Sequence, residues 1–171
     1  MNATTNFQRP TVDTGLLVMR VIMGPAFMAH GAQKLFGWFG GFGLAGTGGY
    51  FETLGFHPGT AFALISGGAE LVGGLLITLG FLGVVGPAMI VGVMTVAIAT
   101  VHLPNGFFAT TNGIELPVMY GVMAMALAIA GFGRHAVDAQ VERTAFLHRP
   151  VVVGGTLGMS VLGAMGSLLM R

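Results

Sequence analysis

The chain has 171 residues, of which 54% are hydrophobic and only 8% are charged, and its formal net charge is +1. About a quarter of the residues of a soluble domain are charged, so these side chains are too few to cover a surface in water, and lipid must be the solvent for most of the chain. The small net charge argues against nucleic acid as a partner, and the absence of cysteine excludes thiolate catalysis, disulfide exchange and iron–sulfur ligation by this chain.

Five apolar segments approach or reach the length of about 20 residues that a membrane-spanning helix needs. In chain order they are residues 14–34, 59–82, 84–101, 114–130 and 151–170. We therefore predict an all-α fold, an integral membrane helical bundle. Its three parts are a four-helix core in residues 1–138, a polar cytoplasmic linker in residues 139–150 and an additional C-terminal transmembrane helix in residues 151–171.

The basic residues outside the spans predict the orientation of the bundle. Arg9 precedes the first span, and Arg134, Arg143 and Arg149 follow the fourth, whereas the segments 35–58 and 102–113 contain neither lysine nor arginine. Loops rich in lysine and arginine stay on the cytoplasmic side, so we expect a multi-pass protein with a cytoplasmic N-terminus and two outward-facing bare segments.

Ionisable residues inside the first two spans each need a reason, because each costs roughly 2.5–3.5 kcal/mol on insertion. At helical spacing Arg20, His30 and Lys34 share one face of the first span, and Glu70 lies on a glycine-lined face of the second. If Glu70 serves chemistry, we expect His30 or Lys34 as its partner. If it is only structural, Arg20 is the natural counter-ion. Lys34 has a third option, which is to extend to the membrane interface.

Two more ionisable residues, His102 and Glu115, are expected at the same outward depth as His30 and Lys34. The structural alternatives are that the histidines are satisfied interior residues, and that Glu115 forms a capping box with Asn112 at the start of the fourth span. The convergence of two histidines, two glutamates and a lysine from four helices favours a site.

The segment 35–58 is rich in glycine and aromatic residues, among them Trp38, and carries no charge before Glu52. A loop this apolar is not expected to lie free in water, so we predict that it folds back over the bundle as a lid or re-entrant segment. Its aromatic residues then form either an interfacial belt or a wall for a flat hydrophobic ligand.

Short motifs in four of these segments resemble the DoxX family of bacterial inner-membrane four-helix proteins. The resemblance rests on His30-Gly31 and Gln33 through Gly41, on Ala69-Glu70-Leu71 with Gly73-Gly74, on Val101-His102 with Asn105 through Phe108, on Gly113 with Glu115, and on Gly131, Gly133, Arg134 and Asp138. It spans residues 14–138 and implies a location in the bacterial inner membrane. Relatives include quinone-reducing membrane subunits and a membrane partner in an oxidative-stress complex, while many members have no assigned activity.

The resemblance and the residues together favour a membrane subunit of a quinone-linked redox system, with a quinone or similar flat ligand at the outer end of the bundle. Electrons must come from other subunits, because no redox centre of this chain is evident. The expected catalytic residues, which would pass protons, are Glu70 and Glu115, and the expected quinone-binding residues are His30, Lys34, Trp38 and His102. The alternatives are a non-catalytic anchor or assembly subunit of a larger membrane complex, a carrier of small molecules or ions, and a haem or metal held by His30 and His102.

Overall fold

The computed structural model describes residues 3–171, and the secondary structure of these residues is helical, without a strand. The all-α prediction is therefore confirmed. The α-helices are α1 (Ala3–Phe36), α2 (Gly43–Thr53), α3 (Gly59–Leu79), α4 (Val85–Ala97), α5 (Glu115–Ala130) and α6 (Pro150–Leu168). Shorter helical segments are η1 (Trp38–Gly40), the π-helical η2 (Ile98–His102), η3 (Leu103–Asn105), η4 (Ala109–Thr111), η5 (Asp138–Gln140) and η6 (Glu142–His148).

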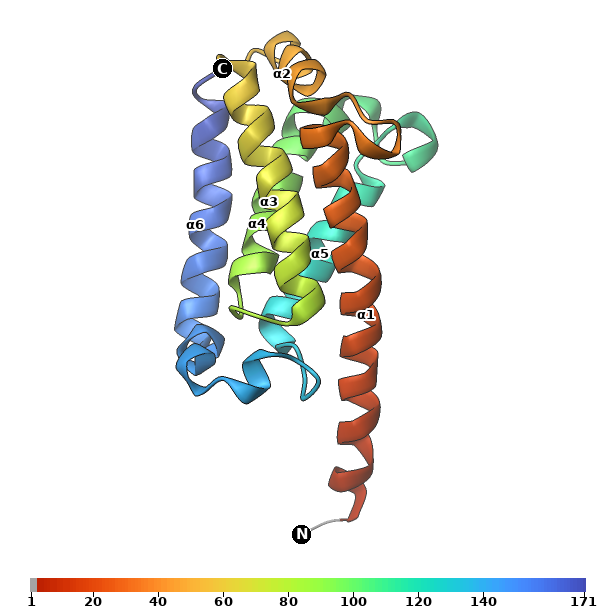
Figure 1. The fold of residues 1–171 in the computed structure, drawn as a ribbon, viewed down its shortest axis with the longest axis vertical. Coiled ribbons are helices and arrows are strands. Elements are labelled where there is room, and N and C mark those ends of the chain that lie inside the picture. Colours follow the sequence, from red (N-terminus) through yellow and green to blue (C-terminus); the bar gives the residue numbers. More distant parts are fainter. Residues whose placement is uncertain (1–2) are drawn as a thin grey trace.

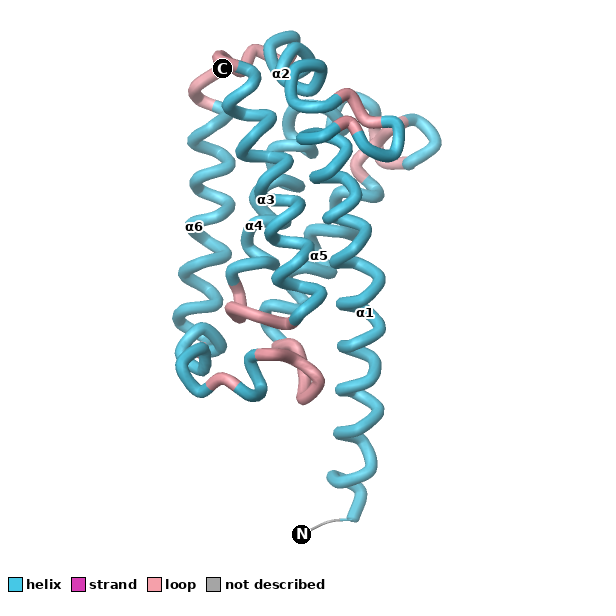
Figure 2. The backbone as a smooth tube through the Cα atoms, viewed as in Figure 1, coloured by secondary structure: helices cyan, strands magenta, loops and turns pink. Residues whose placement is uncertain are grey.

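Helices α1, α3, α4, α5 and α6 run alternately up and down, and the connecting loops gather at the two ends of the bundle (Figures 1 and 2). Helix α2 lies across one end, here called the α2 end, where the C-terminus also lies (Figure 1). The other end, here called the N-terminal end, holds the turn between α3 and α4 and residues 131–149. An odd number of crossings places the two chain termini at opposite ends.

Four stretches are long and apolar enough to cross a membrane: 10–36, 59–79, 85–105 and 150–168. The fifth crossing, α5, has 16 residues and a length of about 24 Å, and the turns of η4 precede it. The predicted spans are confirmed to within a few residues at most ends. Helix α1 is the exception: it begins at Ala3 rather than near residue 14, and its 34 residues extend about 51 Å, beyond the bundle (Figure 1).

The prediction that the segment 35–58 folds back over the bundle is confirmed, but the element that covers the bundle is the helix α2 rather than an irregular loop. Helix α2 packs on α3 and α1 and buries Thr47 and Gly48. A Cβ atom added at Gly48 would lie 3.0 Å from the backbone of Thr60, the second residue of α3. A larger residue at this position would therefore lift α2 off the bundle.

The C-terminal helix α6 packs mainly on α4. The Ser160 hydroxyl donates to the carbonyl oxygen of Ala88 over 2.5 Å, and Val153 and Ala164 are buried. Arg171 donates to the Leu54 carbonyl at 2.9 Å, which joins the end of the chain to the loop after α2. The additional helix is thus an integral wall of the bundle.

Candidate functional site

The centre of the candidate site is an ion pair between α1 and α3. Lys34 Nζ donates to Glu70 Oε1 over 2.5 Å and to Ser66 Oγ over 3.3 Å. The Glu70 side chain is 3% exposed, and its Oε2 atom has no hydrogen-bond partner among the described residues. The prediction of a partner from the outward set, Lys34, is confirmed, and the alternative in which Lys34 extends to the interface is wrong.

Glycines allow α1 and α3 to approach closely enough for this pair to form. A Cβ atom added at Gly31 would lie 2.6 Å from the carbonyl oxygen of Gly67, and one at Gly74 would lie 2.5 Å from that of Gly24. Real Cβ atoms essentially never come this close, so the two backbones touch where these glycines face one another. The short interhelical distance lets Lys34 reach one turn deeper into the bundle, to Glu70.

Arg20 does not contact Glu70 but bonds backbone carbonyl oxygens near the end of α3. Its guanidinium donates to the carbonyl oxygens of Ile77 at 3.1 Å, Thr78 at 2.9 Å and Phe132 at 2.9 Å, and it lies 5.6 Å from the centre of the Phe132 ring. The residue is 1% exposed. The alternative of an Arg20–Glu70 pair is therefore wrong, because Arg20 instead satisfies the last carbonyls of α3 and ties them to the segment after α5.

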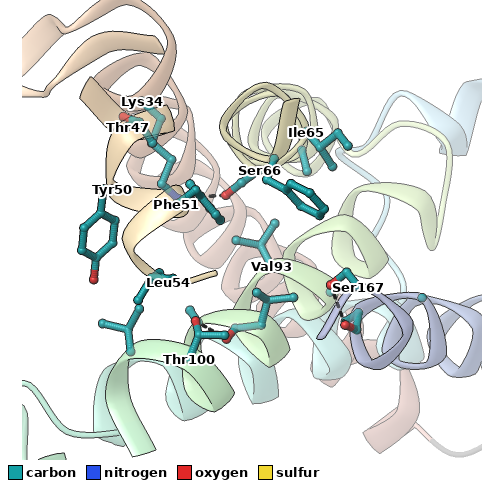
Figure 3. A pocket seen from close by; sticks show the side chains of 18 of the residues that line it. Lys34, Thr47, Tyr50, Phe51, Leu54, Ile65, Ser66, Val93, Thr100 and Ser167 are labelled. Carbon is teal, nitrogen blue, oxygen red and sulfur yellow. Dashed lines mark hydrogen bonds between the residues drawn. The ribbon is translucent and has the colours of Figure 1, made fainter. Parts of the chain in front are cut away.

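A cleft of about 850 Å³ opens beside the ion pair, between α2, α3, α4 and α6 (Figure 3). Apolar side chains and glycines form most of its wall, among them Met89 and Gly92 of α4. Two hydroxyls in the wall, those of Thr100 and Ser167, already donate to backbone carbonyls of their own helical segments. The other polar residues that line the cleft are Lys34, Thr47, Tyr50, Ser66 and His102.

A smaller hollow of about 480 Å³, here called the side pocket, lies between the end of α1, the loop after it and α2. His30 and Gln33 line it, and Lys34, Thr47 and Tyr50 line both the side pocket and the cleft. His30 is exposed, and its Nδ1 atom lies 3.1 Å from Gln33 Oε1. His30 thus belongs to the side pocket and does not line the cleft.

His102 ends the π-helical turn η2 and lines the cleft. Its Nδ1 atom lies 2.8 Å from the carbonyl oxygen of Asn112, which can only accept, so Nδ1 carries the proton. In the neutral ring the Nε2 atom is then a hydrogen-bond acceptor.

Glu115 and Trp38 lie away from the cleft and the side pocket. The Glu115 carboxylate accepts from the backbone N–H of Ala109 at 2.8 Å and so orders the loop before α5. The expected capping box is wrong, because the residue before α5 is Ile114, without a side-chain cap, and Asn112 adopts a left-handed conformation. Trp38 is 60% exposed, with its ring 5.2 Å from that of Phe36.

The structure therefore brings Lys34, Glu70 and His102 to the cleft or its edge, places His30 in the side pocket, and leaves Trp38 and Glu115 elsewhere. The catalytic and binding roles of these residues stay predictions. Sequence reasoning missed Thr47 and Tyr50, because α2 itself was not recognised in the glycine-rich segment. It also missed the contribution of α6, which supplies Gly163, Ala164, Gly166 and Ser167 to the cleft, and that of Met170 just after the helix.

Comparison with known families gives one match. The family model described as DoxX matches residues 15–103, more than half of the chain. The chain belongs to the DoxX family. Comparisons with curated proteins and with solved structures gave no match. The matched residues of this DoxX protein include Lys34, Glu70 and His102, whereas Glu115 and the whole of α6 lie beyond them. With its apolar helices, this DoxX family member is a multi-pass protein of a lipid bilayer.

Proposed function

We propose that this DoxX protein is the membrane subunit of a quinone-linked redox system and that it binds the quinone in the cleft. The observation that carries the proposal is the cleft itself, an apolar hollow of about 850 Å³ in a membrane bundle, with a lysine, a histidine and hydroxyl groups in its wall. Pockets for small lipophilic ligands have volumes of about 300–1,000 Å³ and combine apolar walls with a few placed polar groups. The residues present therefore fit a flat ring with carbonyl oxygens and an apolar tail.

The polar residues of the cleft have distinct parts in this proposal. Lys34 has three ammonium protons, of which two point to Glu70 and Ser66, so the third is available to a ligand carbonyl oxygen. The Nε2 atom of His102 accepts a hydrogen bond from a ligand hydroxyl. Glu70 holds or releases a proton beside Lys34. A bound quinone supplies the two-electron chemistry, and its electrons come from other subunits, because the chain has no cysteine and no evident redox centre of its own.

A pair of matched variants on α6 tests the binding site. Gly163 lines the cleft and Gly158 does not, and a Cβ atom at either position would meet nothing within 4 Å. Gly163→Leu should fill the cleft and weaken quinone binding by about tenfold or more, which is about 1.4 kcal/mol, whereas Gly158→Leu should bind like the parent protein. Binding is measured by titration of the purified protein with a short-tailed quinone. Equal affinities of the two variants would refute the cleft as the site.

We further propose that the protein lies in the bacterial inner membrane with its N-terminus in the cytoplasm. Arg134, Arg143 and Arg149 all lie at the N-terminal end of the bundle, which supports this orientation. Gly49 of α2 and Gln140 of η5 are both exposed. Single cysteines at these positions in the otherwise cysteine-free chain should react with an impermeant thiol reagent from opposite sides of the membrane, position 49 from the outside. The reverse sidedness would refute the orientation.

A further inference from the structure

Lys34 lines two hollows. The cleft and the side pocket both have mostly apolar walls, and the side pocket adds His30 and Gln33 to the lysine, threonine and tyrosine that the two share. The Lys34 side chain is 28% exposed, and it contacts Glu70, which is 3% exposed. The buried carboxylate thus touches a cation that is itself reached from the α2 end of the bundle.

The side pocket, which Lys34 also lines, contains a short run of hydrogen bonds from Phe39 through Gln33 to His30. The Gln33 Nε2 atom donates to the carbonyl oxygen of Phe39 at 3.2 Å, which points the other amide atom, Oε1, toward His30 Nδ1. Nδ1 therefore carries the proton, and Nε2 of the exposed His30 ring can exchange protons with water. An imidazole that exchanges protons with water thus lies in the same hollow as Lys34.

The path from Glu70 toward the N-terminal end is closed. Between the two helices the backbones of Gly24 and Gly74 leave no room for a methyl group. The apolar core fills the space behind them, and Arg20 seals the end of α3 by its three bonds to carbonyl oxygens. Helix α4, which packs on α3, has no titratable residue between Val85 and Ala97. Among the titratable groups near the pair, His30, Tyr50 and His102 line the two hollows at the α2 end, and Tyr120 of α5 packs on Phe27 with 5.4 Å between ring centres.

From these observations we propose that the side pocket is an aqueous entry through which the Lys34–Glu70 pair exchanges protons with the α2 side of the membrane, and with that side alone. The free Oε2 atom of Glu70 is the atom that takes up the proton, and release of the proton restores the ion pair. The one-sided exchange rests on the proposed function, in which a quinone in the cleft consumes or releases protons. These protons would then come from, or return to, one side of the membrane only.

The test follows the protonation of Glu70 in sealed vesicles without added quinone. The full-length protein is reconstituted in one orientation, and the carboxylic acid C=O band of Glu70 is identified in infrared spectra by its loss in Glu70→Gln. The pH is then changed on one side at a time, between about pH 4 and about pH 10. The band should follow the pH on the α2 side and ignore the pH on the other side.

Two labelled variants probe the entry itself. Phe42 lines the side pocket and is 84% exposed, whereas Gly49 lies on the same outer surface and lines neither hollow. A bulky maleimide on Phe42→Cys should abolish the fast response of the Glu70 band, and the same label on Gly49→Cys should leave it unchanged. A band that follows the opposite side, a Glu70 that never titrates, or a label at position 42 without effect would each overturn the inference. Because quinone is absent, none of these outcomes bears on binding in the cleft.

Discussion

The Lys34–Glu70 pair predicts an asymmetric response to replacement of its two members by methionine. Lys34→Met removes the one hydrogen-bond partner that the described residues provide for a carboxylate that is 3% exposed, and breaking a buried pair in this way costs about 3–5 kcal/mol. We expect about 3 kcal/mol, at the lower end, since Glu70 escapes part of the penalty by taking up a proton. Glu70→Met should cost only about 1 kcal/mol, because the Lys34 side chain is 28% exposed and keeps its bond to Ser66.

The double variant Lys34→Met/Glu70→Met distinguishes a true pair from two independent residues. An apolar pair of similar volume often replaces a buried ion pair at little cost, so the double variant should lose less than about 1 kcal/mol. The interaction free energy in the cycle is then about 3 kcal/mol. The free energy of unfolding of all four proteins is measured in mixed micelles, with far-ultraviolet circular dichroism as the signal. Additive losses, or equal losses in the two single variants, would refute the reasoning.

Three further predictions follow from the packing. Arg20→Met should destabilise the protein by about 3–5 kcal/mol through its three lost bonds, and the loss should add to that of Glu70→Met within about 0.5 kcal/mol, since Arg20 bonds the last turn of α3 whereas Glu70 lies near the middle of that helix. Gly31→Ala should cost about 1–3 kcal/mol in the same unfolding assay, whereas Gly68→Ala on α3, where a Cβ meets nothing, should be neutral or stabilising. Truncation after Gln140 should leave an inserted protein, detected by membrane fractionation, that no longer binds quinone, because α6 forms one wall of the cleft.

Hydropathy predicted the spanning helices well because a bilayer demands long apolar runs whatever their partners are. It did not find α2, because this helix lies at an end of the bundle and four of its eleven residues are glycine. Glycine disfavours helices in isolation, so only the contacts of α2 with α1 and α3 explain its formation. The side chains Thr47 and Tyr50, which line both hollows, were missed with it.

The site was predictable where helical periodicity determined which side chains meet. Lys34 and Glu70 lie on facing stripes of two antiparallel helices, and spacing and depth limited the partner of Glu70 to His30, Lys34 or Arg20, of which the structure selects Lys34. Glu115 and Trp38 depend instead on loops whose course is set by positive φ angles, at Asn112 in one and at Gly37 and Gly40 in the other. Sequence periodicity carries no information about such turns, and these two residues lie away from the cleft.

Helix α6 shows why small residues alone do not locate a helix contact. The pair Gly154 and Gly158 has the spacing of a packing motif, yet a Cβ atom at either would meet nothing within 4 Å. The contact with α4 is made on another face, by Ser160, which bonds the Ala88 carbonyl, and by Val153, which packs with Ala88. The residues of α6 that line the cleft follow from this orientation, and all of them lie beyond the part of the chain that the DoxX model matches. The ion pair is therefore a feature of the matched core, whereas the shape of the cleft depends on a helix outside it.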